Sequence, residues 1–227
     1  MSKKQLFRQA TLDILPLAVA VIPWGILSGA IGVGIGLTFW QAQGMSMFVF
    51  AGAAQLSAMT LMGAGAGWLA INGSVFAISS RHMLYSLDLR KDVYNLPAKW
   101  RVMLAFFLTD EMYAVTKAYH DKYKRFSPWY SLVAGIVFYL FWNVSTLVGI
   151  VMGEKIGHLE NLGLDFAIVA VFIAITAANL RQLSMIAATI TSGVAAIYFK
   201  EIMPDSYVII ASLLGMSAGY LVSRIFR

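Results

Sequence analysis

The sequence has no cysteine and few charged residues. Without cysteine, the chain can form neither disulfides nor thiolate-based catalytic or metal sites. Charged residues make up only 12% of the 227 residues, whereas hydrophobic residues make up 59%. Soluble domains carry about 25% charged residues, so this composition indicates an integral membrane protein embedded in a lipid bilayer.

Motifs of enzymes and nucleotide-binding proteins are also missing. The chain has no His-Glu-x-x-His motif and no convincing Ser/His/Asp arrangement, which argues against a membrane-embedded hydrolase. The Gly-x-Gly-x-Gly at 32–36 follows no strand, so a dinucleotide site is not expected. The net charge of +6 could suggest nucleic acid, but the basic residues lie in short loops, as the positive-inside rule requires. We therefore expect no enzyme, metal, cofactor or nucleic-acid partner.

The apolar runs define the predicted fold. At roughly 20 residues for each transmembrane helix, the chain has room for seven or eight spans. We predict an all-α, polytopic transmembrane helix bundle forming one integral membrane domain over 1–227, with 1–125 and 126–227 as candidate related halves. The predicted spans cover residues 14–39, 45–62, 68–85, 102–119, 128–152, 164–180, 183–199 and 207–223.

Proline and glycine interrupt the first predicted span. Pro16 and Pro23 each remove a backbone hydrogen bond, which frees carbonyl groups one turn earlier. Two readings stay open, a kinked packing helix and a broken helix that offers backbone groups to a ligand. Glycines spaced by four residues favour close helix contact in several spans. They are Gly25, Gly29, Gly32 and Gly36, then Gly149, Gly153 and Gly157, then Gly215 and Gly219.

Two basic loops, 86–101 and 117–127, flank the predicted span 102–119. If that helix spans the bilayer, the two loops lie on opposite sides, and one of them breaks the positive-inside rule. A re-entrant hairpin over 45–85 would move the violation from the first loop to the second. We prefer eight crossings, with both termini and 117–127 in the cytoplasm.

A weak internal repeat supports the idea of two halves. Ser-Ser-Arg-His at 79–82 resembles Asn-Leu-Arg-Gln at 179–182, and the segment after Phe50 faintly echoes the one after Asp165. Transporters are often built from duplicated halves with the binding site between them.

Five short motifs follow one another along the chain: Ile-Pro-Trp-Gly at 22–25, Phe-Ala-Gly-Ala-Ala-Gln at 50–55, Ser-Ser-Arg-His at 79–82, Thr-Asp-Glu at 109–111 and Leu-Asp-Phe-Ala at 164–167. Together they resemble the AzlC (azaleucine-resistance) family, the large subunits of bacterial branched-chain amino-acid exporters. The resemblance covers nearly the whole chain and implies a multi-pass protein of the bacterial cytoplasmic (inner) membrane. It also implies secondary active efflux of leucine, isoleucine, valine and methionine, with a small AzlD-like membrane subunit as partner. The sequence departs from the family at Ser79, where an asparagine is usual.

The polar residues inside apolar runs are candidates for substrate binding, because polar groups are costly in a bilayer. Arg81 could clamp the carboxylate of a zwitterion bidentately, unless it is an interfacial arginine that reaches for lipid phosphates. Gln55, the carbonyls freed by Pro23, or Asp110 could accept the ammonium. The predicted substrate-binding residues are Pro23, Gly25, Gln55, Asn72, Arg81 and His82.

The adjacent pair Asp110 and Glu111 is the candidate site of proton coupling. Two neighbouring carboxyl groups in a low-dielectric setting disfavour joint ionisation, which should keep one protonated near neutral pH. The alternative is an interfacial pair that is solvated or bound to Lys117. A channel, or a scaffold subunit that does not itself transport, stays open as a second function. A carrier would saturate and show counterflow, whereas a channel would conduct far faster.

Overall fold

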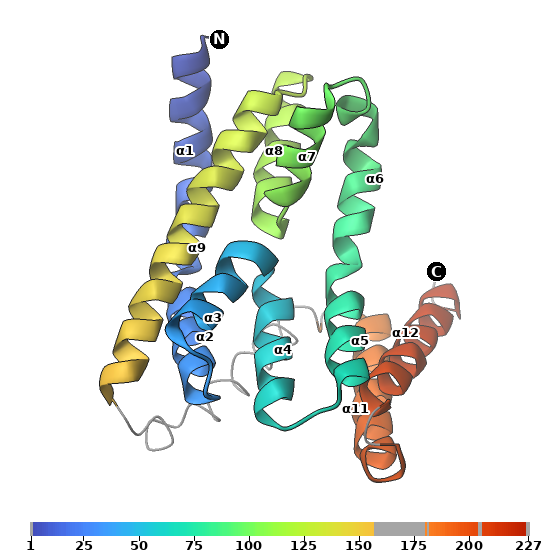
Figure 1. Ribbon diagram of the computed structural model, residues 1–227. Coiled ribbons are helices and arrows are strands. Elements are labelled where there is room, and N and C mark those ends of the chain that lie inside the picture. The colour runs from blue at the N-terminus through green and yellow to red at the C-terminus, as the bar shows by residue number, and fades with distance from the viewer. Residues whose placement is uncertain (1, 157–179, 181, 204–205, 226–227) are drawn as a thin grey trace. The chain divides into compact units, whose positions relative to one another are not determined.

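The computed structural model describes residues 2–156, 180, 182–203 and 206–225, and every regular element among them is a helix (Figure 1). This confirms the predicted all-α class. The predicted span 164–180 and the motif at 164–167 lie almost entirely outside the described residues. The elements are α1 (Lys3–Ala20), α2 (Ile22–Gly34), α3 (Phe39–Gly44), the π-helix η1 (Met45–Val49), α4 (Gly52–Gly63), α5 (Trp68–Ser79), α6 (Arg81–Val93), α7 (Ala98–Phe106), α8 (Asp110–Tyr123), α9 (Pro128–Ile156), α11 (Leu183–Ile202) and α12 (Tyr207–Ile225).

The chain forms two compact units, each made of two segments. Unit 1 comprises Met1–Gln55 and Ser79–Lys155, and unit 2 comprises Leu56–Ile78 and Ile156–Arg227. Unit 1 therefore holds α1 to α3, η1, the start of α4, and α6 to α9. Unit 2 holds the rest of α4, most of α5, and the packed pair α11 and α12.

Three helices in the described part of the chain are long and apolar enough to cross a membrane, namely α9, α11 and α12. The pair α1 and α2, which is bent by 50°, makes a fourth candidate if the two helices form one broken span. Pro23 lies in the first turn of α2, where its missing N–H costs nothing. The break between these helices fits the sequence, but the described residues do not reach the predicted seven or eight spans.

Two of the predicted spans are interrupted helices. The segment 45–62 contains η1 and α4, separated at Phe50, whose φ of 42° is left-handed. The segment 102–119 contains the end of α7 and most of α8, separated at 107–109. The nine residues of α7 are about 14 Å long, roughly half of a bilayer core of about 30 Å. Neither segment is the single continuous span that the apolar composition predicts.

Contacts between α6 and α8 show that these two helices run in the same direction. The Tyr85 hydroxyl donates to Asp110 at 2.7 Å. Three residues further along both helices, the Tyr113 hydroxyl donates to Asp88 at 2.9 Å. Lys117, one turn beyond Tyr113, also donates to Asp88, at 3.0 Å. Because α6 and α8 are parallel, α7 runs in the opposite direction, from the end of α6 back to the start of α8. The helices α7 and α8 therefore form a hairpin whose two outer ends lie at the same end of unit 1 (Figure 1).

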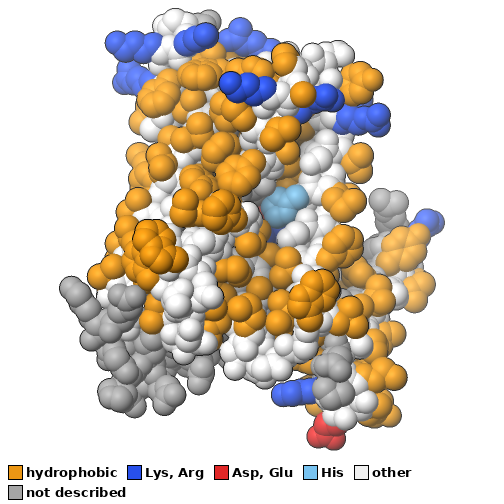
Figure 2. All heavy atoms as spheres, in the orientation of Figure 1, with side chains coloured by type: hydrophobic (Ala, Val, Ile, Leu, Met, Phe, Trp, Pro, Cys, Tyr) orange, Lys and Arg blue, Asp and Glu red, His pale blue; other side chains and the backbone are white. Residues whose placement is uncertain are grey.

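Both basic loops consequently lie at the same end of unit 1, together with the N-terminus. Lys3 lies over the ring of Trp129 at the start of α9, and Gln9 donates to Tyr123 at the end of α8. Lys and Arg side chains gather at this end, and hydrophobic side chains cover most of the surface beneath it (Figure 2). The single helix expected between 86–101 and 117–127 is therefore replaced by a helical hairpin, which brings both loops to one end of unit 1.

Glycine determines how closely α2 and α9 approach each other. A Cβ atom added to Gly29 would lie 2.1 Å from the Thr146 carbonyl oxygen, and one added to Gly149 would lie 2.0 Å from the Ile26 carbonyl oxygen. Side chains cannot occupy either space, so the two backbones touch. In unit 2, Gly215 and Gly219 approach α11 in the same way. The predicted close packing at glycine stripes is confirmed at these positions.

Candidate functional site

The first candidate region is the helix break between η1 and α4, at residues 50–51. A π-helical turn followed by a left-handed, non-glycine residue is a costly local conformation, and such conformations concentrate at functional sites. Phe50 is nevertheless buried. Gly52 follows it and lies against the ring of Trp142, where a Cβ atom would be 3.1 Å from the nearest ring carbon. The Trp142 ring can pack directly on the backbone here because Gly52 has no side chain.

A buried polar cluster lies beside this break, entirely within unit 1. Gln55 is completely buried, and its Nε2 donates to Ser28 at 2.9 Å and to Ser46 at 2.8 Å. Ser46 also accepts from Trp142 Nε1 at 3.1 Å and lies 2.8 Å from the Thr146 hydroxyl. The Gln55 Oε1 atom is buried without a hydrogen-bond partner. A buried acceptor left unsatisfied is costly unless a water or a ligand donates to it.

The second candidate region is an ion pair at the junctions α5–α6 and α7–α8. Arg81 Nη2 lies 2.7 Å from Asp110 Oδ2, and Tyr85 donates to Asp110 Oδ1. The two charged side chains are 41% and 35% exposed, so a small solute can reach them. Only part of the guanidinium is used, because Arg81 Nε is buried without an acceptor.

Local sequence explains why Asp110 stands at this point. Thr109 caps α8 by accepting from the backbone N–H of Met112, which fixes where the helix begins. Asp110 and Glu111 then occupy the first turn, where the helix dipole stabilises negative charge. Arg81 is paired with Asp110, and Lys117 is paired with Asp88 rather than with the acidic pair.

An aromatic cluster connects the two helix breaks, one at Phe50 and one at 107–109. The ring of Phe50 lies 6.4 Å from Phe106 at the end of α7 and 4.8 Å from Tyr139 of α9. Tyr139 is also 5.5 Å from Phe107, and its hydroxyl donates to the Met47 carbonyl of η1. The η1–α4 break and the tip of the α7–α8 hairpin therefore meet inside unit 1.

The remaining predicted substrate-binding residues are not gathered at these two regions. Pro23 is exposed at the start of α2, and Gly25 is buried against Ser145. Asn72 belongs to unit 2, where it donates to Trp68 of its own helix. His82 adjoins Arg81, but its Nδ1 lies 3.0 Å from the Ser79 carbonyl oxygen, and its ring packs against Tyr85.

The structure also adds residues that the sequence did not reveal. Small hydroxyl residues and a tryptophan inside apolar helices carry little signal, since each also occurs at ordinary helix contacts. Residues a hundred positions apart have no visible relation in the sequence until the helices pack. These additional residues are Ser28, Ser46, Tyr85, Trp142 and Thr146.

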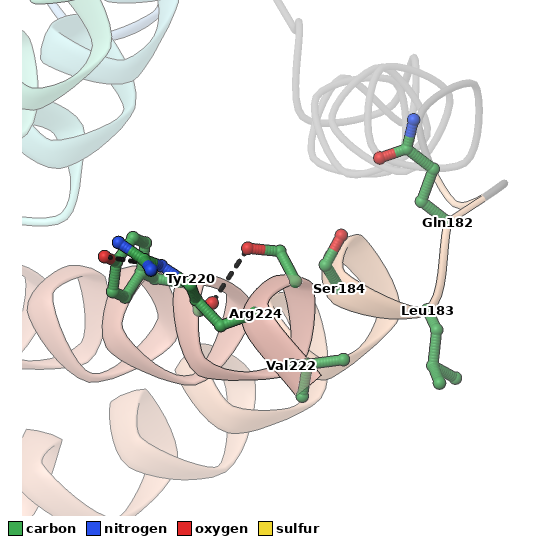
Figure 3. Close-up of a pocket in the computed structure, with 7 residues that line it drawn as sticks. Gln182, Leu183, Ser184, Tyr220, Val222 and Arg224 are labelled. Carbon is green, nitrogen blue, oxygen red and sulfur yellow. Dashed lines mark hydrogen bonds between the residues drawn. The ribbon is translucent and has the colours of Figure 1, made fainter. Parts of the chain in front are cut away.

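An open hollow of about 740 Å³ lies in unit 2 at the ends of α11 and α12 (Figure 3). Its walls include Gln182, Ser184 and Arg224, and the Arg224 Nε donates to the Tyr220 hydroxyl at 3.0 Å. None of the predicted site residues lines it. Among the described residues, no group of histidine and acidic side chains could hold a metal ion.

Comparison with known proteins identifies relatives across the chain. It is 28% identical over 225 residues to an uncharacterized membrane protein of Archaeoglobus fulgidus, which covers 98% of this chain and 96% of the relative. It is 26% identical over 170 residues to an uncharacterized membrane protein of Helicobacter pylori, covering 74% of this chain and 73% of the relative. It is also 30% identical over 156 residues to the inner membrane protein YgaZ of Escherichia coli, covering 63% of each chain. No solved structure matches.

The family model of the AzlC protein matches residues 16–156. This range includes α2 to α9, and therefore both helix breaks, the Gln55 cluster and the Arg81–Asp110 pair. It covers well over half of the 227 residues. The chain is thus a membrane protein that belongs to the AzlC family.

Proposed function

We propose that this chain is the large subunit of a membrane permease, not an enzyme, that exports leucine, isoleucine, valine and methionine. The observation that carries the proposal is the Arg81–Asp110 pair, which joins two opposite charges where α6 and α8 begin. Ionisable residues at such positions commonly mark substrate or proton pathways.

The geometry around Arg81 suits the carboxylate of an amino acid. A guanidinium presents several N–H donors in one plane, and a carboxylate can accept two of them at once. Asp110 uses only Nη2, so the buried Nε–H still lacks an acceptor. The ammonium of the same substrate has two candidate acceptors in unit 1, the Asp110 carboxylate and the Gln55 amide oxygen.

We further propose that the proton motive force drives export through Asp110 and Glu111. Protonation of Asp110 would remove its charge pairing with Arg81, so the charge at the carboxylate clamp depends on one proton. Glu111 is the adjacent carboxyl group on the same helix turn and offers a second protonation site.

The charge distribution supports a location in the bacterial cytoplasmic membrane. With both basic loops and the N-terminus at one end of unit 1, the positive-inside rule places that end in the cytoplasm without violation. The printed name of the Escherichia coli relative, an inner membrane protein, points the same way.

A small AzlD-like membrane subunit is proposed as partner on the strength of the family alone. The glycine stripes do not add support, because Gly29, Gly149 and Gly215 contact neighbours within their own unit. We expect the purified chain in liposomes to be inactive until the second subunit is added. Full export by this chain without a second polypeptide would contradict the proposal.

The proposed function can be tested by loading cells with dipeptides of each candidate amino acid and following efflux. Cells that express this chain with the partner gene should export the branched-chain amino acids and methionine at a saturable rate, whereas cells with either gene alone should not. Non-saturating flux with measurable conductance would indicate a channel. Unchanged efflux in all strains would reject the export function.

A further inference from the structure

We infer that the buried hydrogen-bond network around Gln55 locks its carboxamide in one orientation, so that Gln55 selects the amine of the transported solute. This inference rests on the proposed function, because it assigns one recognition step to the same permease. It concerns a specificity-determining residue, Gln55, and two positioning residues, Ser46 and Thr146, that hold it.

The orientation of Gln55 follows from counting protons in the network. Thr146 donates its hydroxyl proton to the Trp142 carbonyl oxygen at 3.0 Å, so it acts as an acceptor toward Ser46 at 2.8 Å. Ser46 therefore donates to Thr146 and has only lone pairs left for its other neighbours. It accepts from Trp142 Nε1, which can only donate, and from Gln55 Nε2. Gln55 must therefore present its amino group to Ser46 and its oxygen elsewhere.

The opposite orientation of the amide is less favourable. With Oε1 toward the serines, Ser46 would have to donate to Gln55, and Thr146 would have to give up its bond to the Trp142 carbonyl. The Nε2 group would then be buried with two N–H donors and no acceptor. Buried donors without acceptors are rarer than carbonyl oxygens without donors. The network consequently leaves one unpaired polar atom for a ligand, the buried acceptor Oε1.

Gln55 Oε1, which has no hydrogen-bond donor, differs in this respect from the oxygens of Asp110 as a partner for an amine. Both oxygens of Asp110 are occupied, Oδ1 by the Tyr85 hydroxyl and Oδ2 by Arg81 Nη2. Asp110 keeps further lone pairs and could still accept from an ammonium, but Arg81 already offsets its charge, whereas Gln55 Oε1 has no donor at all.

The start of α4 supplies a second feature that suits an amino acid. The first backbone bond of α4 runs from the Gln55 N–H to the Ala51 carbonyl, so the N–H groups of residues 52–54 have no partner within the helix. Free N–H groups at a helix start attract a carboxylate. An unpaired acceptor on Gln55 and unpaired N–H groups in the first turn of the same helix suit the amine and the carboxylate of one zwitterion.

The test compares leucine with its 2-oxo acid, which keeps the carboxylate and the branched side chain but has no N–H donor. Binding of both compounds is measured on the purified protein, and counterflow of both is measured in proteoliposomes with the partner. Wild-type protein should bind leucine at least about tenfold more tightly, since a hydrogen bond to a charged group contributes about 1.5–3 kcal/mol.

Paired variants separate recognition by Gln55 from its role in packing. Gln55→Leu should reduce the preference for leucine to about twofold or less, and should do so through KM rather than the maximal rate. Thr146→Val removes the acceptor for the Ser46 proton, which lets Ser46 donate to Gln55 and lets the amide turn over. The preference should then also fall, while Thr146→Ser should retain it.

Gln43 provides a matched control. It is also a buried amide with an unpartnered Oε1, and its Nε2 donates to Asn143, but it lies within α3 rather than at the start of a helix. Gln43→Leu should keep the wild-type preference. A lost preference in Gln43→Leu with a retained one in Gln55→Leu would overturn the assignment.

The possible failures can be told apart. If wild-type protein binds leucine in preference to the 2-oxo acid but does not export it, the export function fails while the role of Gln55 is still decided by the binding data. If leucine is exported and both Gln55→Leu and Thr146→Val keep the preference, Oε1 is satisfied by a water and the inference is wrong. If wild-type protein does not discriminate between the two compounds, the inference is also wrong.

Discussion

At the scale of single residues, the Arg81–Asp110 pair and the Gln55 cluster differ in their exposure to solvent. Arg81 and Asp110 are about two-fifths and one-third exposed, whereas Gln55 is completely buried. An exposed ion pair contributes little to stability, about 0–1 kcal/mol. Removing the charge pair should therefore affect transport more than folding, whereas substitutions in the buried cluster should affect both.

The role of Arg81 is tested by Arg81→Lys, which keeps the charge but loses the planar set of donors. If Arg81 clamps the carboxylate, kcat/KM for export should fall by at least about tenfold, the loss expected when one charge-assisted hydrogen bond is removed. The amount of protein in the membrane should stay near normal, since the pair is partly exposed. Equal transport by the lysine variant would show that only the charge at this position matters.

Proton coupling is tested by Asp110→Asn and Glu111→Gln. Each variant removes one protonation site while keeping the size of the side chain, so uphill export driven by an imposed pH gradient should be abolished. Exchange of substrate across the membrane should stay measurable in reconstituted counterflow, because exchange needs no net proton movement.

Asp88→Asn serves as the matched control for these carboxylates. Asp88 accepts from Tyr113 and Lys117, a similar set of partners at the level of the next turn of the same two helices. Uphill export should be unchanged in this variant. If Asp110→Asn and Glu111→Gln both concentrate substrate at the wild-type rate, the acidic pair is structural.

At the scale of elements, the prominent features are interrupted helices and glycine contacts. The chain changes direction or conformation at Val21, Phe50 and 107–109, and two of these breaks meet through the aromatic cluster. A helix end leaves backbone donors and acceptors without internal partners, which a membrane tolerates only inside the protein or beside a wet cavity. The long α9 supports these breaks, because it supplies Tyr139, Trp142 and Thr146.

The contact between α2 and α9 predicts a strong effect of Gly149→Val. The added side chain would overlap the backbone of Ile26, which cannot move without shifting α2. We expect a loss of about 1–3 kcal/mol or more of folding free energy, as for overpacked cores. Unfolding of the purified protein, followed by heat or denaturant, measures this loss.

Gly193→Ala is the control for Gly149→Val. A Cβ atom at Gly193 of α11 would meet nothing within 4 Å, so this variant should be neutral or more stable by about 0.5–1 kcal/mol, as for alanine in a helix interior. Equal stability of the two variants would show that α2 and α9 do not pack as described.

At the scale of the whole chain, the hairpin of α7 and α8 predicts which loops share a side of the membrane. Parallel contacts between α6 and α8 bring 86–101 and 117–127 to one end of unit 1. That arrangement agrees with the positive-inside rule for both loops, which a spanning helix at 102–119 could not do.

Because the chain contains no cysteine, its topology can be tested with single cysteines on the natural sequence. Lys99→Cys and Lys122→Cys, both at exposed positions, should react with an impermeant thiol reagent from the same side of the membrane. Gly34→Cys, at the far end of α2, should react from the opposite side. Labelling of Lys99→Cys and Lys122→Cys from opposite sides would contradict this topology and would indicate that 102–119 spans the membrane.

The sequence alone determined the class of the protein and singled out part of its candidate site. Low charge and long apolar runs determined that it is a helical membrane protein, since these properties do not depend on how the helices pack. Three long spans, at α9, α11 and α12, were predicted within a few residues. Arg81, Asp110 and Gln55 were singled out for the same reason, because a polar residue in an apolar run is costly wherever it lies.

Tertiary structure decided which of these residues are partners and where the helices break. Composition cannot distinguish one apolar helix from two short ones, so the breaks at Phe50 and at 107–109 were missed, and with them the shared side of the basic loops. The Gln55 network joins positions up to a hundred residues apart, and only the packing of α9 against the η1–α4 break brings them together. Hydrogen bonds have short reach and require direction, so no pattern along the chain could have revealed them.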